Sequence, residues 1–352
     1  MPAGNGSLMG TYQNPVYPHY FADPFVWEHE GKYFAVGTGP VTPVTHATDK
    51  DLKPQKLGSH HFAFPLLTSN DLCHWELHGG GLKVPDWAAT GEFWAPEVAY
   101  ADGTFYMYYS VATRGLEHGL RVAAASQPTG PFEDVGPLLS PKAYDCPFAI
   151  DAHPFRDTDG QWYLFYSTDF LDVSQGKRAG TGLVVERLVN MTQLAGDRQI
   201  VMRANADWHL FKAQREMYGQ VYDWHTLEGP CVRKHNGLYY CFYSGGCYEG
   251  QGYGVDYGVA DNIMGPYSNE GCSMGARVLR TVPGKVLGPG HHSIVRGPDR
   301  ETEYIVYHAW DVGMTARRMC IDKLYWTPNG PRCAGPTWTP QPTPGVTAAL
   351  PG

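Results

Sequence analysis

One hairpin pattern recurs five times along this chain of 352 residues. In each copy a short apolar segment precedes a turn, and a second segment rich in aromatic and β-branched residues follows it. Alternating residues of these types on both sides of a turn predict a β-hairpin. The copies begin at Ala22, Trp94, Asp151, Glu228 and His291. The repeat therefore predicts a fold assembled from similar antiparallel units.

A second, more variable strand pair follows each hairpin, so that a repeat contains four strands over roughly 60 to 70 residues. This arrangement predicts an all-β fold, a five-bladed β-propeller with four antiparallel strands per blade. The chain lacks helical periodicity and regular strand–helix alternation, which excludes helical bundles and α/β folds. We expect a single domain over residues 1–352, with the first dozen or so residues and the tail 341–352 loosely attached.

The charge and composition of the chain exclude several classes of protein. A net charge of −8 excludes a strongly basic nucleic-acid-binding protein, and 18% charged residues exclude a disordered polyelectrolyte. No apolar run is long enough to span a membrane. Aromatic residues make up 13% of the chain, which suits both strand packing and the stacking of rings on sugars. We therefore expect neither a nucleic-acid partner nor a membrane partner.

The first residues show neither the charged nor the apolar region of a signal peptide, which favours a cytoplasmic location; secretion stays open if a leader was removed. The eight cysteines are scattered and form no Cys-x-x-Cys pair, which argues against a zinc site. The sequence selects no disulfide pattern, and we expect mostly reduced, buried thiols.

Three acidic residues recur near the start of the repeats. Counting along the copies places Asp23, Asp151 and Glu228 at equivalent positions of the innermost strands, facing one central pocket. Carboxylates brought together away from water repel one another, so at least one should have a raised pKa. Glycoside hydrolysis uses such a set, in which one acid is protonated and another is ionised. The alternative for Asp23, which precedes Pro24, is an ordinary turn residue.

Six segments of the chain carry a resemblance to a known family: residues 14–16, 22–26, 93–98, 149–155, 227–230 and 288–293. Through these segments the sequence resembles glycoside hydrolase family 43, from about Asn14 to Trp326. The resemblance implies a five-bladed propeller enzyme that inverts the anomeric centre. It implies that Asp23 is the general base, that Glu228 is the general acid, and that Asp151 orients this acid and tunes its pKa.

The resemblance also implies residues around the sugar and an ion. Arg317 matches an arginine that contacts the sugar, and Trp94 matches an aromatic residue beside the pocket, although it could equally pack within its blade. His291 matches a histidine near Ca²⁺, or another divalent cation, on the propeller axis. Because Ca²⁺ prefers oxygen ligands, water would complete its shell; the alternative is a channel histidine without metal. Strand alternation allows only one of His291 and His292 to face the axis.

Further candidates for lining the pocket are Phe25, Phe93, His153 and Tyr248. An aromatic insertion over residues 205–226 leads directly into Glu228, and we expect it to wall the sugar pocket, which favours exo action.

The leading hypothesis is an exo-acting enzyme that releases terminal α-L-arabinofuranosyl residues from plant cell-wall polysaccharides or oligosaccharides. Its partner would be a glycan that contains arabinose or xylose. A β-xylosidase, an enzyme with both activities and an endo-arabinanase are the alternatives on the same fold. A sugar-binding propeller without catalysis and a scaffold for protein partners are the hypotheses from other classes.

Overall fold

The computed structural model describes residues 10–47, 51–113, 118–139 and 148–345, and these residues form an all-β fold. The first antiparallel group consists of β2 (Ala22–His29), β3 (Lys32–Thr38), β5 (His60–Ser69) and β6 (Glu76–Val84), with the short β4 (Gln55–Leu57) beside β5. The second consists of β7 (Glu92–Ala101), β8 (Thr104–Ala112), β9 (Gly119–Ala125) and β10 (Phe132–Leu139). These hairpins form where the sequence predicts them.

The third group consists of β11 (Ala149–Arg156), β12 (Trp162–Phe170) and β13 (Gly180–Asn190), with β14 (Gln193–Leu194) and β15 (Gln199–Met202) on β13. The fourth consists of β17 (Gln220–His235), β18 (Leu238–Gly245) and β19 (Gly254–Ala260), with β16 (Leu210–Met217) paired to the start of β17. Two isolated bridges, Val255–Leu279 and Val259–Ser268, pair β19 with the described segment that follows it. This group therefore differs from the four-stranded repeat that the sequence predicts.

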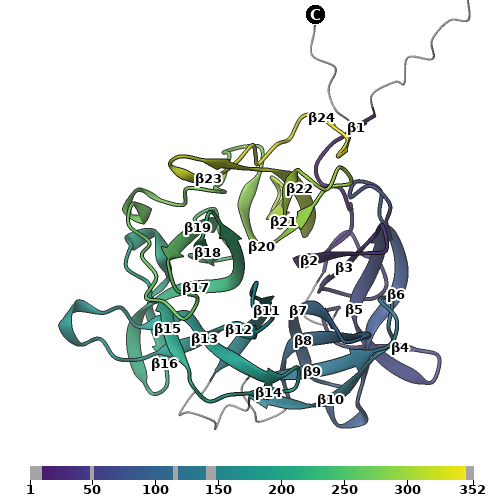
Figure 1. Cartoon of the computed structure of the whole chain (residues 1–352), viewed down its shortest axis with the longest axis horizontal. Helices are drawn as coiled ribbons and strands as arrows, with labels where there is room; N and C mark the ends of the chain where they lie inside the picture. The colour runs from purple at the N-terminus through teal and green to yellow at the C-terminus, as the bar shows by residue number, and fades with distance from the viewer. Residues whose placement is uncertain (1–9, 48–50, 114–117, 140–147, 346–352) are drawn as a thin grey trace, which may run out of the picture.

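The fifth group consists of β20 (Leu287–Arg296), β21 (Glu303–Trp310), β22 (Arg317–Thr327) and β23 (Gly330–Cys333). The groups lie around a common centre (Figure 1), where β2 contacts β7 and β20, β11 contacts β7 and β17, and β17 contacts β20. The first strand of each hairpin is thus innermost, and these strands close a ring. Among the described residues, helix is limited to short 3-10 turns, η1 (Asp86–Ala88), η3 (Ser174–Gly176), η4 (Asp207–His209) and η5 (Cys272–Met274).

The two ends of the described chain pair with each other. β1 (Thr11–Tyr12) pairs antiparallel with β24 (Gln341–Pro342), and the Tyr12 hydroxyl donates a hydrogen bond to the Ile321 carbonyl at 3.0 Å. The expectation that both terminal segments are loose is therefore wrong for these residues, while residues 1–9 and 346–352 lie outside the description.

The seven described cysteines are free, and five of them are buried, as expected; Cys146 lies outside the described residues. No helix among the described residues is both long enough and apolar enough to cross a membrane.

The innermost strands share one irregularity, a shift of register near the centre of the ring. It follows the pairs Ala22–Thr38, Trp94–Ser110, Ile150–Ser167, Glu228–Ser244 and Gly290–His308. The next residue has a left-handed backbone each time: Asp23 (φ 52°), Ala95 (45°), Asp151 (59°), Gly229 (57°) and His291 (43°). Such a bulge bends the strand and redirects a side chain. Asp23 and Asp151 are thus equivalent, but Glu228 comes one residue earlier than the repeat count predicts.

The neighbouring group holds the backbone at four of these five positions. The backbone N–H groups donate to a polar side chain on β3, β8, β18 or β21: Ala95 to Thr38 (2.8 Å), Asp151 to Ser110 (3.2 Å), His291 to Ser244 (2.7 Å) and Asp23 to His308 (3.1 Å). The fifth N–H, that of Gly229, donates instead to the Asp151 carboxylate at 3.0 Å. The hydrogen bonds at the bulges therefore connect neighbouring groups of the ring and hold the backbone of the acidic residues in place.

Candidate active site

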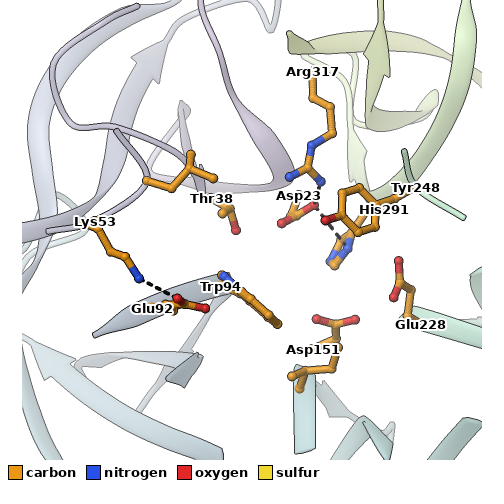
Figure 2. A pocket seen from close by; sticks show the side chains of 12 residues that line it. Asp23, Thr38, Lys53, Glu92, Trp94, Asp151, Glu228, Tyr248, His291 and Arg317 are labelled. Atoms are coloured by element: carbon orange, nitrogen blue, oxygen red, sulfur yellow. Dashed lines mark hydrogen bonds and ion pairs between the residues drawn. The ribbon is translucent and has the colours of Figure 1, made fainter. Parts of the chain in front are cut away.

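Asp23, Asp151 and Glu228 line one cavity of about 300 Å³ at the centre of the ring (Figure 2). This volume lies at the small end of the range for small-molecule sites. The remaining lining residues are Thr38, Leu52, Lys53, Glu92, Trp94, Ile150, Tyr248, His291 and Arg317. The structure thus brings together the three acids that the sequence predicts, although they come from three different innermost strands.

Asp23 is held as an ionised carboxylate. Its side chain is buried, and Arg317 Nη1 lies 3.2 Å from its Oδ1 (Figure 2). Burial alone would raise the pKa of Asp23, but His291, Arg317 and His308 lower this pKa by more, to well below its usual range. Burial also lowers the pKa of both histidines, so Arg317 is the partner that carries a full charge at neutral pH. Asp23 can therefore accept a proton from water.

Glu228 is poised to hold a proton. Burial and the negative charge of Asp23 raise its pKa, while hydrogen bonding by Tyr253 and the charge of Arg317 lower it; the balance is a pKa of about 7. The Tyr253 hydroxyl donates to Glu228 Oε1 at 2.6 Å, and its ring stacks on His308 at 5.8 Å. Tyr253 is not among the residues predicted from the sequence. It packs against Gly290, where a Cβ atom would lie 2.2 Å from the Tyr253 ring.

Asp151 completes the acidic set. Burial and the neighbouring carboxylates of Glu228 and Asp23 raise its pKa well above the usual value, against a lowering by the Gly229 N–H. Two neighbouring buried carboxyl groups ionise together only at a high electrostatic cost, so the Asp151–Glu228 pair retains a proton. The site therefore combines a carboxylate with a protonated acid, the combination that glycoside hydrolysis requires.

A second cavity, of about 830 Å³, adjoins the first and shares Lys53, Glu92, Trp94, Ile150, Glu228 and Tyr248 with it. Of the three acids, only Glu228 lines both cavities. The hairpin of β16 and β17 lines the second cavity through Phe211, Arg215, Met217, Tyr218 and Trp224. No residue from 205 to 226 lines the first cavity, so the expectation that this insertion walls the sugar pocket is wrong. It walls the adjoining space instead.

The predicted binding residues divide into two sets. Arg317 contacts Asp23, while Tyr248 and Trp94 line both cavities. The Tyr248 ring lies 4.8 Å from the Arg317 guanidinium carbon, and the Trp94 ring stacks on His118 at 3.5 Å. Trp94 therefore both packs against His118 and lies beside the cavities, which were the two alternatives for its position.

Phe25, Phe93 and His153 line neither cavity, so their prediction as pocket residues is wrong. The two phenylalanines pack in or against the core between the first two groups. His153 is buried below the site, where its Nε2 accepts the Val232 N–H at 3.0 Å and its Nδ1 therefore donates to Glu97 at 2.7 Å. His153 on β11 thus connects to β7 through Glu97 and to β17 through Val232.

His291 lines the first cavity, and its Nδ1 lies 3.4 Å from Asp23 Oδ1. His292 lines neither cavity and faces Phe242 at 5.8 Å, as strand alternation predicts. Over the described ranges, no three His, Cys, Asp or Glu side chains are grouped so that they could hold a metal ion. The described side chains near His291 therefore do not by themselves form the oxygen-rich set that Ca²⁺ prefers, so water would have to supply most ligands of an ion there.

Comparison with known proteins agrees with this geometry. The family model described as glycosyl hydrolases family 43 matches residues 12–331. A β-D-galactofuranosidase of Aspergillus niger is 29% identical over 333 residues, which cover 90% of this chain and 83% of that protein. An extracellular endo-α-(1→5)-L-arabinanase of Bacillus subtilis is 26% identical over 248 residues, 68% of each chain.

Among solved structures, that of a thermostable family-43 glycoside hydrolase superposes with a TM-score of 0.77 and 28% identity, covering 96% of this chain and all of that one (100%). Because the family model spans nearly the whole chain, its match is not confined to a single motif. The chain belongs to glycosyl hydrolases family 43.

Proposed function

We propose that the protein is an inverting exo-glycosidase that releases terminal α-L-arabinofuranosyl residues from plant cell-wall polysaccharides or oligosaccharides. One observation carries the proposal: Glu228, the acid that retains a proton, stands at the boundary of two cavities, and the ionised Asp23 lines only the first. The terminal sugar binds in the first cavity and the leaving group in the second. The glycosidic oxygen then lies beside Glu228.

The proposed mechanism is a single displacement. Asp23 accepts a proton from a water molecule, which attacks the anomeric carbon while Glu228 donates its proton to the departing oxygen. In this proposal Asp151, whose own pKa is raised by Glu228, orients that acid and tunes its pKa, and Arg317 helps to keep Asp23 ionised. Attack on the face opposite the leaving group inverts the anomeric centre. In this proposal the five strand groups are the five blades of a propeller, and the reaction takes place on its axis.

The names of several relatives support a furanose as the sugar. One is named a galactofuranosidase, another an L-arabinanase and two are named exo-α-(1→5)-L-arabinofuranosidases, whereas others are named β-xylosidase or xylosidase/arabinosidase. We therefore rank an L-arabinofuranosyl residue first and a β-D-xylosyl residue second. A panel of p-nitrophenyl glycosides tests this choice: α-L-arabinofuranoside, β-D-xylopyranoside, β-D-galactofuranoside and α-L-arabinopyranoside. Fastest hydrolysis of the first supports the proposal, whereas fastest hydrolysis of another names the correct sugar. Hydrolysis of none of them rejects an exo-glycosidase, and a rapid fall in arabinan viscosity would show endo action.

The pH profile tests the role of Glu228. Because Glu228 must be protonated, kcat/KM should fall as the pH rises through about 7. Because the pKa of Asp23 is lowered, the fall of kcat/KM on the acid side should occur below about pH 4, the usual pKa of an aspartate. Tyr253→Phe removes a hydrogen bond that lowers the Glu228 pKa, so the alkaline limb should move to higher pH. Phe keeps the ring that packs on His308. A limb that stays in place or moves to lower pH would contradict this role of Tyr253.

The calcium ion expected at His291 stays a prediction. If an ion binds there, EDTA should lower the Tm or kcat, Ca²⁺ should restore it, and His291→Ala should abolish this response. His292→Ala is the matched control, because His292 lies outside both cavities, and it should keep the response. If chelator changes neither quantity, His291 is a channel histidine that serves Asp23 alone.

A further inference from the structure

We propose that the second cavity recognises a leaving group that carries a sugar carboxylate, with Arg215 as the recognition residue. The inference rests on the proposed function in one respect, that the leaving group occupies this cavity. Arg215 lies on β16 of the hairpin and lines the second cavity together with Glu228. It would therefore contact the part of the substrate that departs, not the terminal sugar.

Arg215 differs from the other described arginine and lysine residues that line the two cavities, Lys53 and Arg317. Lys53 Nζ lies 2.6 Å from Glu92 Oε1, and Arg317 pairs with Asp23 (Figure 2). Arg215 forms no ion pair with any carboxylate in the described ranges of the chain. Its positive charge is thus left for a ligand.

Aromatic rings hold the Arg215 guanidinium in place. Its central carbon lies 4.8 Å from the centre of the Phe211 ring and 5.5 Å from that of Trp224. Trp224 is only 1% exposed, so its ring is fixed by the protein. Rings that cover the faces of a guanidinium leave its edge for hydrogen bonds, and this edge matches a carboxylate with two parallel bonds.

The hairpin itself is fastened before any ligand binds. The Tyr218 hydroxyl donates to Asp169 Oδ2 at 2.6 Å, which ties the tip of the hairpin to β12. The Gln214 N–H donates to Asp223 Oδ1 at 2.9 Å across the hairpin. A recognition residue on a fixed support loses little entropy on binding, which favours affinity.

The described carboxylates that line the second cavity contact groups other than Arg215. Glu92 pairs with Lys53, and Asp169 accepts hydrogen bonds from Tyr218 and from Thr181, the latter at 3.0 Å. Glu228 has a pKa of about 7 and therefore holds its proton below that pH. An arginine that pairs with no described carboxylate favours an anionic ligand, and in a glycan leaving group that anion is the carboxylate of a uronic acid. Glucuronic acid on a xylan chain and galacturonic acid in a pectin chain share this chemistry.

Calorimetric titration of the whole protein tests the inference without any need for turnover. The probes are xylotriose bearing glucuronic acid, the methyl ester of the same compound, trigalacturonate, and plain xylotriose. We expect at least one acid to bind about tenfold more tightly than its neutral counterpart, since a hydrogen-bonded charge contributes this much or more. The preference should shrink as salt is added. The two acidic probes distinguish the two sources of the carboxylate.

Arg215→Gln should abolish the preference, and Arg215→Lys should retain part of it, because lysine keeps the charge but not the paired donors. Lys212→Gln is the matched control: it removes the same charge from an exposed position on the same strand, outside both cavities, and should leave the preference intact. Equal binding of acidic and neutral probes, or a preference that survives in a folded Arg215→Gln variant, overturns the inference. Hydrolysis of p-nitrophenyl α-L-arabinofuranoside, which has no carboxylate, judges the proposed function separately.

Discussion

Glu228→Gln is expected to lower kcat by about 10²- to 10⁴-fold on substrates whose leaving group is a sugar. A sugar alkoxide needs a proton to depart, and glutamine cannot supply one. A p-nitrophenolate departs with little protonation, so an aryl glycoside should lose far less rate. The ratio of kcat values for an arabinofuranosyl oligosaccharide and its p-nitrophenyl counterpart, measured in both proteins, reports this difference.

The control for this variant is Glu216→Gln, which makes the same chemical change at an exposed residue outside both cavities and should leave both rates unchanged. Glutamine keeps an oxygen that can accept the hydrogen bond from Tyr253, so we expect the fold to persist. An equal loss on both substrates would show that Glu228 is not the proton donor.

Asp23→Asn should lower kcat by a similar factor of about 10² to 10⁴, but equally on both kinds of substrate. A better leaving group cannot replace the base that activates water. The variant also leaves Arg317 buried without its carboxylate, and breaking a buried pair in this way costs about 3–5 kcal/mol of stability. Kinetics on both substrates, together with urea unfolding, separate the lost chemistry from the lost stability.

Product stereochemistry provides an independent check on Asp23. Proton NMR of the first sugar released by the native protein should show the inverted anomer. A retained anomer, or a folded Asp23→Asn variant with near-native turnover, would mean that Asp23 does not act as the base of a single displacement.

Local patterns explain why the hairpins and two of the acids could be predicted. Alternating residues around a turn depend on neighbours in sequence, and Asp23 and Asp151 occupy the same place in their repeats. The position of Glu228 relative to Asp23 and Asp151 could not be obtained by counting residues along the repeat. Each innermost strand contains a bulge, and the hairpin turns differ in length. The displacement puts Gly229 at the equivalent position, where its N–H reaches Asp151.

Strand alternation explains one error, and contacts between distant segments explain residues that were not predicted. Phe93 precedes Trp94 in a strand, and alternation sends Trp94 towards the cavities and Phe93 into the core. Tyr253 reaches Glu228 from the residue just before β19, with no pattern around it to mark the contact. His308 did carry a signal, since it stands where three other copies have Ser110, Ser167 and Ser244, and it bonds to Asp23.

At the five left-handed residues around the centre, the backbone holds the strands together and the side chain is left for other roles. At four of them the neighbouring strand grips the N–H group, which every residue except proline has. Asn, Asp, His and Gly tolerate this conformation best, and three of these are also common acids, bases or ligands. A single substitution at one of these positions can therefore change the side chain without changing the backbone geometry. Ala95 is such a position, and its methyl group carries no acid, base or ligand of its own.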